Sequence, residues 1–141
     1  MFCSNILVAF DGSVASEKAL DKAVSIAAMD PRIGIHVLHV VRPRTGAIYV
    51  TGDGSLFEYD MKHGQDVAGK AERRLSGLAN PQTVSVVSGI PEDEIVKFAA
   101  SNGCDMIVVG SRGLSGLKEL ILGSVSHFVA QNADIPVLIV K

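Results

Sequence analysis

The sequence has little of what marks several common classes of protein. It contains only two cysteines, Cys3 and Cys104, which are too few for a disulfide framework and show no metal-ligand spacing. The formal net charge is −2, so charge gives no reason to expect nucleic acid or an anionic membrane as a partner. No apolar stretch approaches the roughly 18 residues of a membrane helix. These absences favour a globular domain without staples, metal or membrane anchor.

The N-terminal region carries no recognisable targeting signal. No basic residue precedes the first apolar stretch, and this stretch, Ile6 to Phe10, is ended by Asp11 before it is long enough for a signal-peptide core. We therefore expect a cytoplasmic protein. Internal repeats, low-complexity tracts and linkers are also missing, and we expect the 141 residues to form one domain spanning 1–141.

Apolar segments and helical patterns alternate along the chain, which is 48% hydrophobic with a mean hydropathy of +0.33. Such alternation indicates βαβ crossovers, and the apolar composition favours a sheet covered on both faces. We predict an α/β fold, a single-domain open five-stranded parallel sheet with helices on both faces. The predicted strands are 5–10, 33–41, 83–87, 106–109 and 136–140, and the predicted helices are 13–29, 61–78, 91–102 and 117–129, with a loop over 42–60.

A glycine- and serine-rich stretch follows the fourth predicted strand. Its spacing is Gly110-x2-Gly113-x9-Gly123-Ser124, with Val125-Ser126 directly after. Glycine allows a ligand to approach the backbone closely, and serine at a helix start leaves N–H groups facing outward. These are the features of an anion site, and we expect the anion to be a phosphate. Because ligands of open parallel sheets bind beyond the carboxyl ends of the strands, Asp11, which follows the first strand, should lie at the same edge.

The whole chain resembles the universal stress protein family, in its nucleotide-binding branch. The resemblance is carried by the glycine pattern and by three further segments: Ile-Leu-Val-Ala-Phe-Asp-Gly-Ser at 6–13, Leu-His-Val at 38–40 and Pro-Val-Leu-Ile-Val at 136–140. It implies strand order 3-2-1-4-5, as in adenine nucleotide alpha hydrolase-like folds. It also implies that ATP, or ADP or AMP, is the ligand.

The resemblance also implies which residues would contact the nucleotide. The adenine and ribose contacts would be Asp11, Val40 and Gly110. The phosphate contacts would be Gly113, Gly123, Ser124 and Ser126, with Val125 between them. Two cations beside the loop, Arg112 and Lys118, are further candidates for phosphate oxygens. Mg²⁺ would be held mainly through the phosphates, because the sequence shows no acidic pair to hold it.

Several of these residues have a second interpretation. Asp11 can cap the helix that begins near Ser13 as well as contact a nucleotide, and the two roles are compatible. His36 and His39 lie on opposite faces of their strand by parity, and without spaced partners both are interpreted as structural. Cys3 and Cys104 precede the first and fourth strands. The family's strand order implies that these strands are neighbours, so the two thiols should share the edge opposite the ligand, as a redox pair or as two inert thiols.

Two classes of function compete for the same site. The first is a nucleotide-dependent stress-response or signalling module without catalysis. The alternative is a slow ATPase or self-phosphorylating enzyme, with loop serines as acceptors: Ser111, Ser115, Ser124 and Ser126. We assign no catalytic residue, because no general base is evident and the Gly-x4-Gly-Lys-Ser/Thr loop is missing. Two further classes are rejected. A receiver domain would need an acidic pair after the first strand, where only Asp11 stands. A dinucleotide-binding domain would need its glycines after the first strand, whereas these follow the fourth.

The last predicted strand is apolar throughout and closes the sequence. An apolar edge strand invites pairing with another chain, unless a helix of its own chain covers the edge. The family resemblance implies dimerisation through this strand. We therefore expect a homodimer formed by the C-terminal strand.

Overall fold

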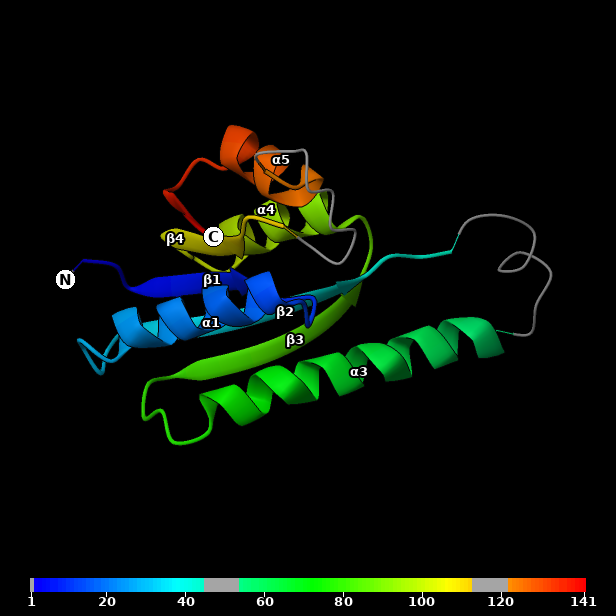
Figure 1. The fold of residues 1–141 in the computed structure, drawn as a ribbon, viewed down its shortest axis with the longest axis horizontal. Coiled ribbons are helices and arrows are strands. Elements are labelled where there is room, and N and C mark those ends of the chain that lie inside the picture. Colours follow the sequence, from blue (N-terminus) through cyan, green and yellow to red (C-terminus); the bar gives the residue numbers. More distant parts are fainter. Residues whose placement is uncertain (1, 45–53, 113–121) are drawn as a thin grey trace.

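A computed structural model describes residues 2–44, 54–112 and 122–141 (Figure 1). The described part of the chain alternates strands and helices as predicted. In chain order the elements are β1 (Asn5–Ala9), α1 (Val14–Ala27), β2 (Gly34–Val41), α3 (Ser55–Leu75), β3 (Gln82–Ser88), α4 (Pro91–Ser101), β4 (Met106–Gly110), α5 (Ser124–Asn132) and β5 (Val137–Val140).

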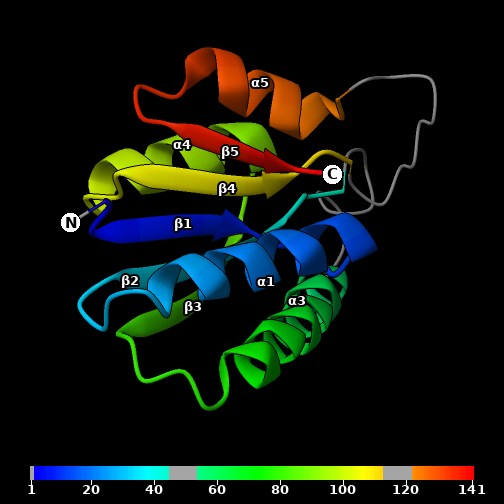
Figure 2. The same ribbon diagram turned by 60° about the vertical axis from the view of Figure 1, so that its left-hand side comes forward.

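The five strands form one parallel sheet in the order β3-β2-β1-β4-β5, which confirms the predicted fold. The chain first builds outward from β1 through β2 to β3, and then crosses back to place β4 and β5 on the other side of β1. Strand order therefore reverses between β1 and β4. The segments that follow these two strands meet at one edge of the sheet, where α1 and α5 begin (Figure 2).

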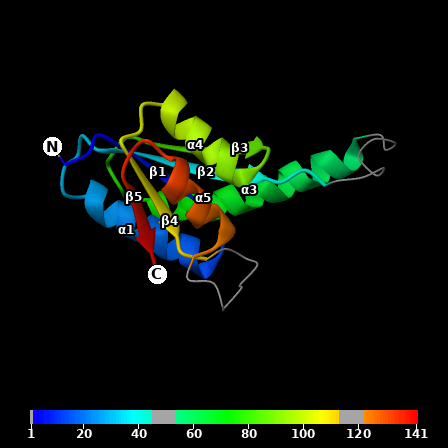
Figure 3. The ribbon, with the colours of Figure 1, turned by 90° about the horizontal axis from the view of Figure 1, so that it is seen from above.

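The sheet lies between two layers of helices, α1 and α3 on one face and α4 and α5 on the other (Figures 2 and 3). Alternation within a strand supplies both layers: Ile6 and Val8 of β1 pack with α1 and α3, whereas Leu7 packs with α4 and α5. All three side chains are fully buried. Burial on both faces explains why β1 and β4 read as continuous apolar runs.

Three helix signals in the sequence are confirmed. Ser13 is the N-cap of α1, and its side chain accepts a hydrogen bond from the Ser16 amide. Pro91 opens α4, with acidic residues in the first turn. Gly103 follows the end of α4 with φ of 63°, the left-handed conformation in which glycine commonly terminates a helix.

The predicted start of the second helix is wrong. We expected a loop to residue 60 and a helix from Met61, but α3 begins at Ser55. Its first turns extend past the end of the sheet (Figure 1), and apolar Phe57 and Tyr59 there are exposed. This part of the helix therefore lacks the helical spacing of buried apolar residues from which a helix is predicted. The N-cap residue is Gly54, which has a left-handed backbone conformation and no side chain to cap the helix. The usual signal for a helix start, a capping side chain, is therefore missing. The helix ends three residues before the predicted Leu78, and the left-handed Gly77 follows.

The remaining boundaries differ by a few residues. Strand β5 begins at Val137 rather than Pro136, whose carbonyl accepts a hydrogen bond from the Ile107 amide. Helix α5 begins at Ser124, so the part of the predicted 117–129 helix before residue 122 lies outside the described residues. Within the described ranges, no helix has the length and apolar character needed to span a membrane.

The two cysteines lie on opposite faces of the sheet. Cys3 belongs to the core on the α1 and α3 face, and Cys104 to the core on the α4 and α5 face. Both are free and buried. Burial raises the pKa of the Cys3 thiol and raises that of Cys104 to about 11. Opposite placement and protonated thiols support the interpretation as inert thiols rather than a redox pair.

Candidate functional site

A cleft of about 150 Å³ opens at the edge of the sheet where strand order reverses. It is the place where open parallel sheets bind their ligands. Eight of the nine predicted site residues fall in the described part of the chain, and all eight line this cleft: Asp11, Val40, Gly110, Arg112, Gly123, Ser124, Val125 and Ser126. The ninth, Gly113, lies outside the described residues, as do Ser115 and Lys118.

The inner part of the cleft is apolar. Leu38 and Val40 of β2, Val109 of β4 and Ile95 of α4 line it together with Ala9. Leu38, Val109 and Ile95 are also buried members of the core on the α4 and α5 face. The floor of the cleft is thus part of the hydrophobic core. It is an apolar surface on which a flat apolar ring of a ligand could pack.

The backbone of Val40 faces a gap between β1 and β2. The ladder between these strands ends with Ala9 opposite Leu38, and the Phe10 amide adds a last hydrogen bond of 3.0 Å to the Leu38 carbonyl. Because alternate residues of a strand turn their N–H and C=O to the same side, those of Val40 also face β1. Among the described residues neither group has a backbone partner there. A donor and an acceptor therefore border the apolar floor.

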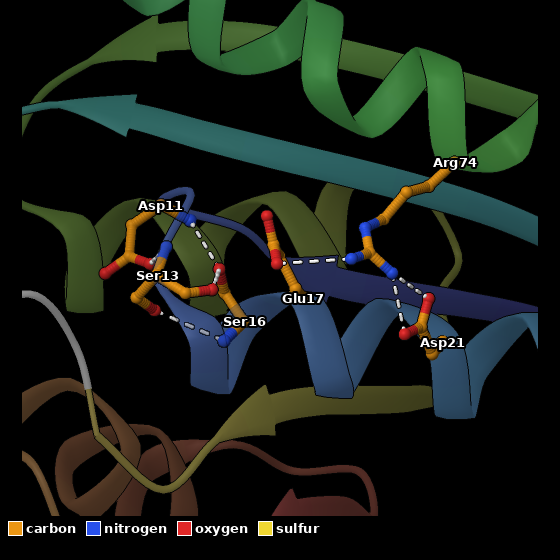
Figure 4. A network of polar contacts seen from close by, with 6 residues as sticks. All are labelled: Asp11, Ser13, Ser16, Glu17, Asp21 and Arg74. Atoms are coloured by element: carbon orange, nitrogen blue, oxygen red, sulfur yellow. Dashed lines mark hydrogen bonds and ion pairs between the residues drawn. The ribbon is translucent and has the colours of Figure 1, made fainter.

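Asp11 is held in place by the start of α1 (Figure 4). Its Oδ1 accepts a hydrogen bond of 2.9 Å from the Ser13 amide, and its own amide donates to Ser16 Oγ at 3.3 Å. The second carboxylate oxygen, Oδ2, has no hydrogen-bond partner among the described residues. Asp11 is half-buried and lines the cleft. Capping of α1 is thus confirmed, and one oxygen is left to accept a hydrogen bond from a ligand.

The first turn of α5 points N–H groups at the cleft. Gly123 is the N-cap, and the His127 amide makes the first intrahelical bond, to the Gly123 carbonyl at 3.0 Å. The amides of Ser124, Val125 and Ser126 precede this bond, so the helix itself supplies them with no acceptor. Three donors and the positive end of the helix dipole are therefore directed at one wall of the cleft.

Ser111 and Ser126 fix the position of this helix start. The Ser111 carbonyl accepts two hydrogen bonds, one from the Gly123 amide at 2.7 Å and one from Ser126 Oγ at 3.2 Å. The Ser111 amide donates to the Val140 carbonyl at 2.8 Å. Ser126 Oγ also contacts the Gly123 carbonyl at 3.1 Å. The hydroxyl of Ser126 is buried and already engaged, whereas Ser124 is exposed. The start of α5 is thus bound to Ser111, which directly follows β4 and is itself bound to Val140 of β5.

Gly110 lines the cleft but is small for another reason. A Cβ on this residue would lie 2.7 Å from the Ala15 carbonyl carbon and 2.8 Å from the Ala15 Cβ and oxygen. These atoms belong to α1, on the other face of the sheet from α4 and α5. The missing side chain therefore makes room for α1, and Gly110 contributes only its backbone to the cleft.

Comparisons with known proteins agree with this fold. A family model described as the universal stress protein family matches residues 3–141. The chain is 38% identical over 147 residues to universal stress protein YxiE of Bacillus subtilis, covering 98% of this chain and 99% of that protein. This chain belongs to the universal stress protein family.

Solved structures of relatives share the arrangement of this universal stress protein. The structure of MJ0577, a protein of Methanocaldococcus jannaschii, matches with a TM-score of 0.87 and 31% identity, covering 98% of this chain and 95% of that one. A universal stress protein in complex with cAMP matches with a TM-score of 0.64 and 28% identity, covering 99% and 97%. The predicted membership and strand order are therefore confirmed.

Several cleft residues of this universal stress protein were not predicted from the sequence. His39, Pro91 and Ile95 line the cleft, although the first is interpreted from the sequence as structural and the other two only as parts of the predicted 91–102 helix. His39 Nδ1 lies 2.9 Å from the Phe10 carbonyl oxygen. The available signal was the position of these residues: His39 precedes Val40, and Pro91 and Ile95 follow β3 at the ligand edge. Arg112 is exposed beside the cleft, as expected for a loop cation.

Metal-binding side chains do not gather in the parts of the chain that the structure describes. No group of three or more His, Cys, Asp or Glu residues within these ranges is arranged to hold an ion. Asp11 is the one carboxylate that lines the described cleft.

The histidines of β2 should make the stability of this universal stress protein pH-dependent. Burial lowers the pKa of His36 and of His39 below the ordinary value of 6.5. The unfolded chain then binds protons that the folded chain does not, so the free energy of unfolding falls as the pH drops below about 6.5. We expect urea denaturation between about pH 7.5 and 5.5 to show this fall. A double variant, His36→Gln with His39→Asn, should flatten it, and an unchanged slope would contradict the assignment.

Proposed function

We propose that this chain binds ATP, or the related nucleotides ADP and AMP, in the cleft and acts as a nucleotide-dependent stress-response or signalling module in the cytoplasm. One observation carries the proposal: a backbone donor and acceptor beside an apolar floor at one end of the cleft, and three N–H groups of a helix start at the other. The two buried, protonated thiols fit a reducing compartment.

The base end of the cleft favours adenine. The adenine ring carries an amino donor next to a ring-nitrogen acceptor, and the Val40 backbone offers a carbonyl and an amide facing the gap. Guanine presents the opposite order, a carbonyl acceptor next to an N–H donor. The apolar surface of Leu38 and Ile95 would pack against the ring. Backbone groups on a strand cannot rotate to accept the wrong base, so this edge supports selectivity.

The phosphate end rests on α5. The N–H groups of Ser124, Val125 and Ser126 would bind the phosphate oxygens, with Gly123 allowing close approach and Arg112 adding charge. Gly113 is proposed as a further phosphate contact, although it lies outside the described residues. One helix end contributes roughly 0.3–1 kcal/mol when exposed, so several hydrogen bonds are needed as well. Mg²⁺ would be held through the phosphates rather than by side chains.

The ribose would lie between these two ends. Asp11 Oδ2 would accept from a ribose hydroxyl, and the backbone of Gly110 forms the opposite wall. The relative of known structure that is in complex with cAMP supports an adenine nucleotide as the ligand class. In this proposal, each of the nine sequence-predicted site residues has a role at one of the three parts of the nucleotide.

Calorimetric titration with ATP and GTP tests the proposal, with ATP expected to bind more tightly. Replacing Asp11→Asn should weaken ATP binding by about tenfold, because a charged hydrogen-bond acceptor is lost. Asn retains the Oδ1 that accepts the Ser13 amide, so the unfolding midpoint should stay near that of the wild type. Asp11→Ala should lose both affinity and stability. Equal affinity in the folded Asn variant would leave Asp11 as a helix cap alone, and no heat with any adenine nucleotide would refute the function.

Slow self-phosphorylation or ATP hydrolysis at the same site is the second candidate function. Of the four serines proposed as acceptors, Ser111 and Ser126 are buried, Ser115 lies outside the described residues, and Ser124 is exposed at the phosphate end. Ser124 is therefore the acceptor that this geometry favours. Incubation with ATP labelled at the γ-phosphate distinguishes the candidates: label that is lost in Ser124→Ala would favour the enzyme, and no label or turnover above background would favour the binding module.

We also propose a homodimer through β5. Among the described residues, strand β5 pairs only with β4, and the carbonyls of Pro136 and Val140 face β4. The N–H and C=O of Ile139 therefore face outward. Ile139→Pro removes one outward donor, which an edge strand tolerates. We expect sedimentation to show a dimer for the wild type and for Ile139→Ala, and a monomer for Ile139→Pro. A monomeric wild type at micromolar concentration would contradict the dimer.

A further inference from the structure

His39 makes an unusual link between the ends of two strands. Its backbone belongs to β2, and its ring lies against α3, where a Cβ on Gly64 would be 3.5 Å from His39 Cδ2. From there Nδ1 reaches the Phe10 carbonyl oxygen at 2.9 Å, just past the end of β1. A carbonyl only accepts, so Nδ1 carries the proton. The side chain thus binds a backbone group that a strand would otherwise use.

The Phe10 carbonyl is the group that Val40 would need. In a parallel ladder that continued past the Phe10-to-Leu38 bond, the next hydrogen bond would run from the Val40 amide to the Phe10 carbonyl. The structure has the His39 imidazole there instead. The ladder therefore stops at Leu38, and the Val40 amide remains open to the cleft.

We propose that His39 is a positioning residue that holds β1 and β2 apart at the cleft and keeps the Val40 amide available for the base of the nucleotide. In this proposal, the bond to the imidazole orients the Phe10 carbonyl toward His39 and away from the Val40 amide, so the two strands do not close over the position of the base. His39 acts through Val40 and need not touch the ligand. This inference rests on the proposed nucleotide binding and adds to it the device that keeps the base subsite open.

The His39 ring can donate this hydrogen bond whether it is neutral or charged. Burial lowers the pKa of His39, although the hydrogen bond to Phe10 and the charge of Asp11 partly oppose this effect, while the nearby His63 adds to it. The neutral ring with its proton on Nδ1 donates to the carbonyl. Protonation at Nε2 would leave that bond in place, so the link does not depend on the charge of the ring.

Two variants separate this role from simple packing. Asn can place a donor N–H near the position of Nδ1, whereas Leu fills similar space without a donor. We expect His39→Leu to weaken ATP binding by at least about tenfold, and His39→Asn to remain within about threefold of the wild type. Inorganic tripolyphosphate has no base, so its affinity should change less than about twofold in either variant. If His39 only filled space, Leu would be the better replacement for the half-buried ring.

Hydrogen exchange of the unliganded protein supplies a readout that does not need the nucleotide. The Val40 amide should exchange fast in the wild type and slowly in His39→Leu, where it can close onto the freed Phe10 carbonyl. Nitrogen NMR of the wild-type ring should show the proton on Nδ1. A protected Val40 amide in the wild type, a proton on Nε2, or a folded His39→Leu that binds ATP normally would overturn the inference. Failure of the wild type to bind any adenine nucleotide would refute the proposed function instead, and the exchange result would still test the link.

Discussion

Replacing Gly110→Ala should destabilise the protein by about 3 kcal/mol, the upper end of what overpacking of a core usually costs. The added Cβ would lie 2.7–2.8 Å from three atoms of Ala15, two of which belong to the backbone of α1. A backbone cannot rotate away as a side chain can, so α1 would have to shift from the sheet. Because α1 packs on buried residues of β1 and β4, the shift would disturb the core. Urea denaturation measures the effect.

Gly69→Ala is the matched control for this substitution. Gly69 lies within α3, and among the described residues its added Cβ would meet only the guanidinium of Arg73, at 3.4 Å. Alanine is the better helix former, so this variant should gain about 0.5–1 kcal/mol. Opposite signs for the same chemical change would show that the surroundings of Gly110 decide its effect. Equal unfolding free energies for the two variants would contradict the close approach of α1.

Gly110 lies where the sequence pattern places it, but its missing side chain has a structural reason that the pattern does not contain. The sequence pattern places it at the cleft, and its backbone is there. The pattern attributes the glycine to the approach of a ligand, whereas the missing Cβ makes room for Ala15 on the other face of the sheet. The distinction needs the position of α1 relative to β4, which depends on contacts between segments far apart in the chain. No local signal in the sequence carries that information.

The fold itself was predictable because its signals are local and repeated. Apolar runs buried on both faces identify the strands, and capping residues such as Ser13 and Pro91 locate helix starts. The start of α3 was missed since its first turns extend past the sheet, and helical periodicity appears only where a helix covers a core. Strand order came from family resemblance, because periodicity does not say which strands are neighbours.

The cleft was predictable in part. Residues after β1 and β4 meet because parallel strands end at one edge, so Asp11 and the start of α5 could be placed together. The role of His39 could not, because it depends on a hydrogen bond to Phe10, which lies 29 positions away in the chain. The hydroxyl of Ser126 is a similar case: the pattern favours phosphate, and the structure shows it engaged with Ser111.

Replacing Ser124→Pro should weaken ATP binding by about tenfold or more relative to Ser124→Ala. Both variants lose the hydroxyl, but only proline also loses the backbone N–H. A hydrogen bond to a charged group contributes about 1.5–3 kcal/mol, which corresponds to a factor of roughly 10 to 150 in affinity. Ser124 is the first residue of α5, where proline is tolerated, and Gly123 already has the extended backbone (φ −69°, ψ 165°) that a following proline requires. Calorimetry of both variants isolates the N–H group.

Val14→Pro controls for the effect of proline at a helix start. Val14 is the exposed first residue of α1, and it does not line the cleft. The residue before it, Ser13, has an extended backbone (φ −70°, ψ 161°) like that of Gly123. We expect this variant to bind ATP as the wild type does. If Ser124→Pro folds and binds like Ser124→Ala, the phosphates do not use this amide. If adenosine, which has no phosphate, loses affinity in Ser124→Pro to the same extent as ATP, the loss arises from a displaced helix. An effect confined to the phosphorylated ligands would show that the start of α5 recognises the phosphate.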